Sequence, residues 1–286
     1  MRKIVILGAT GALGSAVVDR LSSEAKVCPV KVSRSLNQDS NGTIIWDYKS
    51  PLPGEIRNAD VVINCARSDR YIDNIRFNNI LCRDLPLSCK FVNVSSNCVF
   101  AQPRSFWGRL LFKGDAYIRE KKVIEKLTAE RENSLLFRPT IVSDEGGWSQ
   151  FLNSVRSSGT VISPFDSNKS VVKVISRAGV AERIVSYVLG NDSRIESEIF
   201  DSEMTVSDFI AREVIISGRK STYFRSLLKN FLLSLLCSRF LPDSVVFKLQ
   251  RFILAKKSND ISSMDYISDF NIEGMTRLYL FGRHTI

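Results

Sequence analysis

Histidine is almost absent from this chain of 286 residues, and its single copy is His284. A histidine-based nucleophilic system needs a positioned imidazole, and zinc sites combine several histidine or cysteine ligands. The six cysteines form no CxxC pair and show no metal-ligand spacing, which fits reduced thiols better than a disulfide framework. We therefore expect no metal site, and chemistry that rests on other groups.

A targeting leader and long apolar runs are also lacking. The first residues read directly into IVIL, without the basic start, apolar segment and small-residue cleavage site of a signal peptide. The apolar stretch at 231–237 is far too short to span a bilayer. With 44% hydrophobic residues, the chain can bury one substantial core, alone or with a smaller lobe attached. We expect a globular, cytoplasmic protein.

The net charge of +10 is concentrated near the C-terminus. Residues 219–257 contain nine basic side chains and one acid, Asp243, so this segment holds +8 of the total. Leucine and phenylalanine lie between the basic residues, which is typical of a peripheral helix on an anionic membrane, or of helices that cover a lobe. Both interpretations stay open. Nucleic acid is disfavoured because the aromatic residues are not arranged as a stacking platform.

Short β-rich runs alternate with helical periods along the first half of the chain. This alternation predicts an α/β fold: a Rossmann-type, doubly wound parallel sheet covered by helices. The predicted strands are 4–8, 28–33, 43–48, 60–66, 90–96 and 134–142, and the predicted helices are 15–23 and about 115–132.

The pattern loosens after Val142, where glycine-rich and serine-rich stretches precede two predicted helices at 177–189 and 205–215. We interpret this part as a smaller substrate lobe that ends in basic, partly amphipathic helices. The predicted boundary separates a dinucleotide-binding domain, 1–145, from the lobe, 146–286.

The stretch GATGALG follows the first predicted strand directly and precedes the first predicted helix. The first glycine allows a tight turn, the second lets backbone N–H groups approach a pyrophosphate, and the third lets helix pack on strand. The helix would direct its positive end at the anion. We predict a dinucleotide-binding turn with cofactor contacts from Gly8, Thr10, Gly11, Ala12, Leu13 and Gly14.

The end of the second predicted strand bears on the choice of dinucleotide. A site for NAD usually places an acid there to bind the ribose 2′-hydroxyl. This chain has Ser33 and Arg34 in that region, and no acid before Asp39. Because a guanidinium matches a 2′-phosphate in charge and geometry, we predict a preference for NADP over NAD.

Tyr117 and Lys121 are four residues apart and therefore share one face of a predicted helix. An ordinary tyrosine has a pKa of about 10, too high for efficient proton transfer at neutral pH, so a nearby ammonium is needed to stabilise the phenolate. Ser96, at the end of the fifth predicted strand, would orient a substrate oxygen. A nicotinamide would carry the hydride.

GATGALG, VVINCA, VNVSSNCVF, YIREK and LLFRPTIV occur in an order and at a spacing that resemble the extended short-chain dehydrogenase/reductase family, especially its nucleotide-sugar branch. The resemblance covers residues 3 to about 142. It implies catalytic roles for the Ser96, Tyr117 and Lys121 set, with Tyr117 and Lys121 also touching the cofactor. The further implied positions are Asn64, Cys65 and Ala66 beside the adenosine ribose, Asp47 near adenine, and Asn74 behind the lysine.

The residues after Ser96 bear on the type of reaction. The family's sugar dehydratases usually carry an Asp-Glu pair there, whereas this chain has Asn97 and Cys98, which disfavours dehydration. SSNCVF most resembles the STDYVF-like pattern of 4-keto-sugar reductases, although Asn97 departs from its aspartate. We predict an NADP-dependent reductase of a nucleotide-activated keto-sugar. A sugar epimerase with tightly bound NAD, and a catalytically silent dinucleotide-binding regulatory or scaffold protein, remain the alternatives.

The resemblance also implies a setting. Members of this family often form homodimers, and enzymes that act on polysaccharide precursors often work near the inner membrane. We therefore expect a homodimer and a role in polysaccharide biosynthesis, with residues 219–257 as the segment for peripheral membrane contact.

Overall fold

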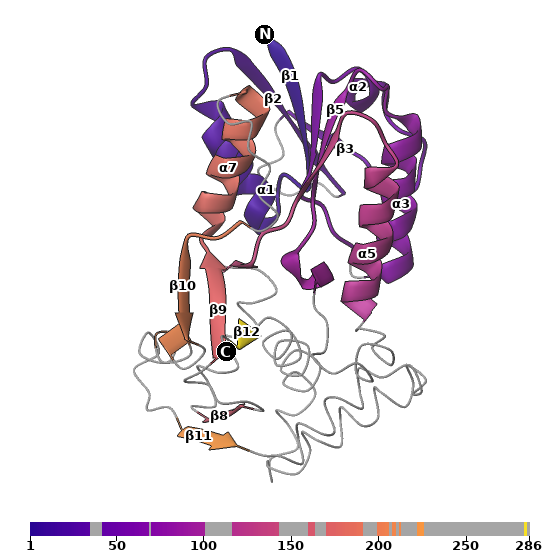
Figure 1. The fold of residues 1–286 in the computed structure, drawn as a ribbon. Helices are drawn as coiled ribbons and strands as arrows, with labels where there is room; N and C mark the ends of the chain where they lie inside the picture. The colour runs from indigo at the N-terminus through magenta and orange to yellow at the C-terminus, as the bar shows by residue number, and fades with distance from the viewer. Residues whose placement is uncertain are drawn as a thin grey trace, which may run out of the picture. The chain divides into compact units, whose positions relative to one another are not determined.

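Six parallel strands form the predicted sheet, in the spatial order β3-β2-β1-β4-β5-β6 (Figure 1). This order confirms the predicted Rossmann-type fold class. Successive strands are added outward from β1 in both directions, so the chain reverses between β1 and β4. The bounds are β1 Arg2–Leu7, β2 Val27–Ser33, β3 Thr43–Ile45, β4 Val61–Asn64, β5 Lys90–Val94 and β6 Ser134–Phe137.

The structure is a computed structural model, and the chain divides into two units. The first unit comprises Met1–Val99, Ala116–Thr140 and Ile175–Asp201, and the second comprises Phe100–Asp115, Ile141–Val174 and Ser202–Ile286. Residues 175–201, which lie beyond the predicted boundary at 145, therefore belong to the first unit. The described residues are 1–34, 42–68, 70–100, 116–142, 160–163, 170–190, 199–205, 208–209, 212, 222–225 and 283–284.

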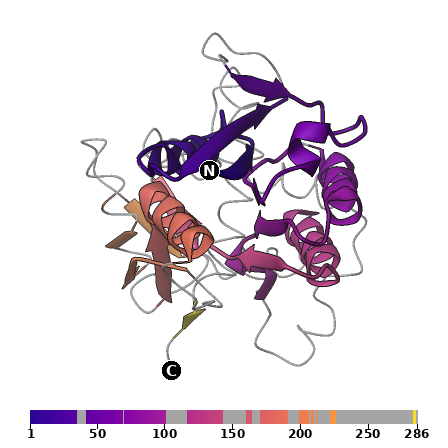
Figure 2. The ribbon, with the colours of Figure 1, turned by 90° about the horizontal axis from the view of Figure 1, so that it is seen from above.

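Helices cover both faces of the six-stranded sheet (Figure 2). On one face, α1 (Ala12–Ser22) packs against α7 (Arg177–Leu189), and Arg20 of α1 pairs with Glu182 of α7. The other face carries α2 (Gly54–Arg57), α3 (Tyr71–Asp84) and α5 (Ala116–Ala129). The helices predicted at 15–23, 115–132 and 177–189 correspond to α1, α5 and α7.

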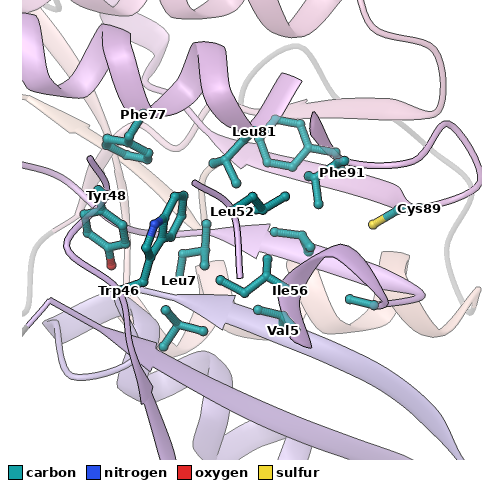
Figure 3. Close-up of a cluster of buried hydrophobic side chains, with 14 residues drawn as sticks. Val5, Leu7, Trp46, Tyr48, Leu52, Ile56, Phe77, Leu81, Cys89 and Phe91 are labelled. Carbon is teal, nitrogen blue, oxygen red and sulfur yellow. The ribbon is translucent and has the colours of Figure 1, made fainter. Parts of the chain in front are cut away.

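One cluster of the core lies between the sheet and helices α2 and α3 (Figure 3). The central strands β1, β4 and β5 are largely apolar, because a parallel strand between two helical layers has no solvated side. The ring of Tyr48 stacks on that of Phe77 at 5.0 Å between centroids, and Trp46 meets Tyr48 edge-on. The most deeply buried members of this cluster include Val5, Leu7, Trp46, Ile56, Phe77, Leu81 and Phe91.

The strands predicted at 60–66 and 90–96 end two residues early, at Asn64 and Val94, and two other predicted strands differ more from the structure. The strand predicted at 43–48 ends at Ile45, because a turn follows in which the Asp47 carboxylate accepts backbone N–H groups and Tyr48 has a φ of +63°. The strand predicted at 134–142 is divided at Arg138. β6 ends at Phe137, and β7 (Ile141–Val142) pairs instead with β9 of the second unit.

The second unit is described in part. β9 (Ser170–Ile175) lies between β10 (Ser202–Thr205) and β12 (Arg283–His284), while β8 (Thr160–Ser163) pairs in parallel with β11 (Thr222–Arg225). Of the helix predicted at 205–215, residues 208, 209 and 212 are helical, Thr205 ends β10, and the others lie outside the described residues.

The basic segment 219–257 lies outside the described residues except for β11. Within the part of the chain that the structure describes, no helix is both long and apolar enough to cross a bilayer.

Candidate active site

The glycine-rich turn joins β1 to α1 at the carboxyl edge of the sheet, next to the point where the strand order reverses. In doubly wound folds this reversal opens a crevice in which ligands bind. The N–H groups of Gly8 and Ala9 donate to the Val32 carbonyl oxygen at 3.0 and 3.1 Å, which fixes the turn to β2. Among the described residues, no side chain caps α1 at Gly11. Uncapped N–H groups at the start of a helix, here those of Ala12, Leu13 and Gly14, are suited to binding an anion.

Two of the three glycines are required by the backbone geometry. Gly8 has a φ of +74°, and a Cβ there would lie 2.7 Å from the Cα of Ala66. A Cβ on Gly14 would lie 2.1 Å from the carbonyl oxygen of Gly8. No side-chain rotation could relieve these contacts, because the neighbouring atoms belong to the backbone. The sequence therefore forms a tight turn on which the helix and the end of β4 both converge.

The end of β2 lies beside this turn. The hydroxyl groups of Thr10 and Ser33 are 3.1 Å apart, and Ser33 is buried. Arg34 follows directly and is exposed. Arg34 is thus the first residue after β2, at the carboxyl edge of the sheet, where folds of this type bind the ribose of a dinucleotide.

Asp47 has a local structural task. Its Oδ1 accepts hydrogen bonds from the backbone N–H groups of Lys49 and Ser50 and from the Ser50 hydroxyl, all within 2.9 Å. These hydrogen bonds hold the pKa of the Asp47 carboxyl below its ordinary value. Asp47, which the sequence predicts to lie near adenine, is exposed in this turn.

The end of β4 meets the glycine turn directly. Cys65 and Ala66 are the backbone segment against which Gly8 packs, and the N–H of Cys65 donates to the Leu7 carbonyl at 3.1 Å. Burial raises the pKa of the Cys65 thiol to about 12, against the influence of the Lys121 ammonium. A thiol held in its neutral form is a poor nucleophile, so Cys65 serves the site as packing.

Asn64 anchors a network of buried amides below this edge. Its Nδ2 donates to the Oδ1 atoms of Asn78 and Asn93, both at 3.0 Å, and its Oδ1 accepts the N–H of Ala66 at 3.1 Å. Asn93 also donates to the hydroxyl of Thr128 on α5 at 2.8 Å. The network joins β4, β5, α3 and α5, so it fixes the relative positions of the elements that carry the candidate catalytic residues.

Tyr117 and Lys121 lie on α5 as predicted, on one face of the helix. The Lys121 ammonium is nine-tenths buried, donates to the Val94 carbonyl at 3.1 Å, and lies 5.7 Å from the centroid of the Tyr117 ring. Val94 ends β5. The lysine therefore ties the helix that carries the tyrosine to the carboxyl edge of the sheet.

Ser96 is buried two residues beyond Val94, where β5 gives way to a 3-10 turn over Asn97–Phe100. Two neighbouring polar atoms, the Ser95 Oγ and the Asn97 Oδ1, are buried and have no hydrogen-bond partner among the described residues. Buried polar atoms are normally paired, so these two identify a place where a ligand or ordered water is expected.

These features fit a dinucleotide. The glycine turn offers a cradle that a Cβ would fill, the α1 N-terminus suits a pyrophosphate, and unpartnered polar atoms follow β5. Within the described ranges, no three His, Cys, Asp or Glu side chains form a group that could hold a metal ion.

Sequence reasoning missed Arg67 and Glu120. The Arg67 guanidinium lies over the Tyr117 ring, 4.6 Å from its centroid, and its Nε is 3.7 Å from the Glu120 carboxylate. Glu120 lies within YIREK and Arg67 directly follows VVINCA, but their contact joins the loop after β4 to α5, which no local pattern predicts. For Asn93 a signal was available: it is paired in register with Asn64, and each interrupts an apolar strand at the same edge.

Asn74, predicted to stand behind the lysine, instead holds the loop after β4. Its Oδ1 accepts the N–H of Ser68 at 2.6 Å, and its Nδ2 donates to the Ser68 carbonyl at 2.7 Å.

No protein-family model matches the chain, and no curated protein matches it. Solved structures do. A nucleoside-diphosphate-sugar epimerase from Staphylococcus aureus gives a TM-score of 0.58 at 11% identity, covering 98% of this chain and 95% of that one. A dTDP-4-dehydrorhamnose reductase from Bacillus anthracis in complex with NADP gives 0.56 at 13% identity, covering 81% and 86%.

A dTDP-glucose 4,6-dehydratase from Bacillus anthracis in complex with NAD is similar to the same degree, with a TM-score of 0.57 at 14% identity, covering 79% and 85%. The chain therefore has the fold of these nucleotide-sugar enzymes. For the fold, this confirms the resemblance to extended short-chain dehydrogenases/reductases that the motifs indicated.

Proposed function

We propose that the protein is an NADP-preferring oxidoreductase that reduces a keto group of a nucleotide-activated sugar. The observation that carries this proposal is the gathering of three features at one edge of the sheet. These are the glycine turn, the end of β4 that packs against it, and Lys121 bound to the end of β5 with Tyr117 beside it.

The residues divide the work as follows. Tyr117 donates its phenolic proton to the carbonyl oxygen of the substrate, and the Lys121 ammonium stabilises the phenolate that remains. The Ser96 hydroxyl hydrogen-bonds to the same oxygen and orients it. When bound, the nicotinamide supplies the hydride for the carbonyl carbon. Gly8, Gly11 and Gly14 leave room for the dinucleotide to approach the backbone.

The preference for NADP rests on Arg34. Arg34 follows β2 directly, at the carboxyl edge of the sheet, where its guanidinium would pair with a 2′-phosphate. The reductase in complex with NADP shares this fold, and so does the dehydratase in complex with NAD, so the choice depends on this chain's own arginine.

The experiment uses purified protein, NADPH and a panel of nucleoside-diphosphate 4-keto-sugars, with Tyr117→Phe as the variant. We expect substrate-dependent oxidation of NADPH, which Tyr117→Phe lowers by about 10² to 10⁴-fold because it removes the general acid. NADPH binding, measured by fluorescence, should stay unchanged. Tyr187→Phe removes a phenol from α7, beside Lys90 at the start of β5; it is the matched control and should keep its turnover. Full turnover in Tyr117→Phe would contradict the proposal.

A sugar epimerase is the second candidate, because one similar structure is a nucleoside-diphosphate-sugar epimerase. Denaturing extraction of the purified protein separates the two. Tightly held NAD and interconversion of sugar nucleotides without net oxidation of NADPH indicate the epimerase. Tight dinucleotide binding without any turnover indicates a regulatory or scaffold protein.

A homodimer, a place in polysaccharide biosynthesis and membrane contact through residues 219–257 stay predictions of the sequence. Size measurement in solution and sedimentation with anionic vesicles test the first and the last.

A further inference from the structure

Arg67 occupies an unusual place for a charged residue, directly over the ring of the candidate acid. The centre of its guanidinium is 4.6 Å from the centroid of the Tyr117 ring, closer than the Lys121 ammonium at 5.7 Å. A guanidinium at this distance attracts the face of an aromatic ring, and attracts it more strongly once the ring carries a negative charge.

The loop that carries Arg67 is fixed on both sides. Before it, the Asn64 side chain accepts the N–H of Ala66 at 3.1 Å. After it, Asn74 forms two hydrogen bonds with the backbone of Ser68, at 2.6 and 2.7 Å. The backbone of Arg67 is therefore positioned before any ligand binds, and little entropy is lost when its side chain acts.

Glu120 holds the side chain of Arg67 from the other element. Its carboxylate is 3% exposed and lies 3.7 Å from the Arg67 Nε, and its Oε1 has no hydrogen-bond partner among the described residues. Burial raises the pKa of the Glu120 carboxyl, opposed by the charges of Arg67 and Lys121. Glu120 is three residues after Tyr117 on α5, so one arginine bridges the carboxylate and the ring.

We infer that Arg67 is a positioning residue for the proposed reaction: it clamps the Tyr117 ring against α5 and stabilises the phenolate that proton donation leaves. The inference rests on the proposed role of Tyr117. The described charged groups around the ring are Arg67, Lys121 and Glu120, two cations and one buried carboxylate. This balance of charge favours the phenolate form of Tyr117. Of the two cations, Arg67 lies nearer to the centroid of the Tyr117 ring.

The test measures the ionisation of Tyr117 in the full-length protein, without substrate. Tyrosine labelled with carbon-13 at Cζ is followed by NMR through an alkaline titration, and Tyr117→Phe identifies the resonance. In Arg67→Gln we expect the titration midpoint to rise by about 1 pH unit, because one nearby positive charge is lost. Arg67→Lys should shift it less, since the charge remains and only the planar contact is lost.

Arg57→Gln is the matched control. It removes the same charge from α2, which precedes β4 and so lies at the opposite end of that strand. It should leave the Tyr117 midpoint unchanged. If Arg67→Gln shifts the midpoint no more than Arg57→Gln does, the inference is overturned. The side chain of Arg67 is 47% exposed, so both variants should fold, and far-ultraviolet circular dichroism at each pH checks this.

Failure of the proposed function and failure of the role of Arg67 give different results in these experiments. If Tyr117→Phe keeps full turnover, the proton donor is another group, whatever the titration of Arg67→Gln shows. If Tyr117→Phe is inactive and Arg67→Gln leaves the midpoint unchanged, the proposed function stands and the role of Arg67 falls.

Discussion

Strands β4 and β5 are apolar along most of their length and become polar at their carboxyl ends. Val61, Val62 and Ile63 are completely buried, and then comes Asn64; Phe91 and Val92 are followed in the same way by Asn93. Both parts of these two strands are buried, but the apolar part is held by side-chain packing and the polar part by hydrogen bonds. The apolar half stabilises the fold, while the polar half sets the positions of the residues at the site.

The physical reason lies in how strictly each kind of contact fixes geometry. An apolar core tolerates small shifts as long as volume is conserved, whereas a buried amide network is favourable only when every donor and acceptor is paired. Asn64, Asn78 and Asn93 therefore hold β4, β5, α3 and α5 in one relative arrangement. A dinucleotide site that spans the ends of these strands needs that arrangement.

The largest expected effect comes from a cavity in the hydrophobic cluster that packs against the apolar parts of β4 and β5. Phe77 is completely buried and stacks on Tyr48. Phe77→Ala should lower the free energy of unfolding by about 3 to 5 kcal/mol, because it leaves a cavity in the core. Urea denaturation measures this loss. NADPH affinity, measured under conditions where the variant is folded, should change little; a large loss of affinity would show that the two halves are not separate in role.

Alkaline pH provides a second way to weaken this hydrophobic cluster, through Tyr48. Burial raises the pKa of Tyr48 from about 10 to about 12, so the folded state keeps a proton that the unfolded state has lost. The stabilisation is fully present below pH 10 and is lost as the pH rises to 12, by about 2 to 3 kcal/mol. Urea midpoints measured across this range should fall less steeply in Tyr48→Phe. Equal slopes in both proteins would contradict this origin.

A change in the buried amide network of Asn64, Asn78 and Asn93 should affect NADPH binding more than it affects stability. Asn93→Ala removes two donated hydrogen bonds and one accepted bond, and leaves partners on α3 and α5 buried without them. We expect a loss of about 1 to 3 kcal/mol in the free energy of unfolding, less than for Phe77→Ala. NADPH affinity and turnover should fall together in the folded variant. Asn79→Ala, an exposed asparagine on α3, is the control and should change neither NADPH affinity nor turnover. Wild-type affinity in Asn93→Ala would remove the proposed positioning role.

The sequence predicted the fold and the glycine turn because both depend on local patterns. IVIL followed by GATGALG determines a strand, a turn and a helix within one short segment, and Gly14 is required by a contact inside it. Tyr117 and Lys121 were equally accessible, since their spacing alone places them on one helical face. The end of β3 was missed because the turn at Asp47 and the positive φ of Tyr48 replace a strand that propensity favours.

Contacts between distant segments could not be predicted in the same way. Arg67 meets Tyr117 and Glu120 only because β4 and β5 are neighbours in the sheet and α5 packs beside α3. The amide network likewise depends on the register that pairs Asn64 with Asn93. The sequence shows which residues are present, but not how the strands and helices are placed relative to one another, and that placement brings these residues into contact.

A crystal structure of the protein with NADP⁺ bound is the most direct test of the central claim, that the carboxyl edge of the sheet is a working dinucleotide site. We predict the pyrophosphate on the first N–H groups of α1, the 2′-phosphate on Arg34, and the nicotinamide beside the hydroxyl of Tyr117. A dinucleotide bound elsewhere, or a nicotinamide that lies away from Tyr117, Lys121 and Ser96, would contradict it.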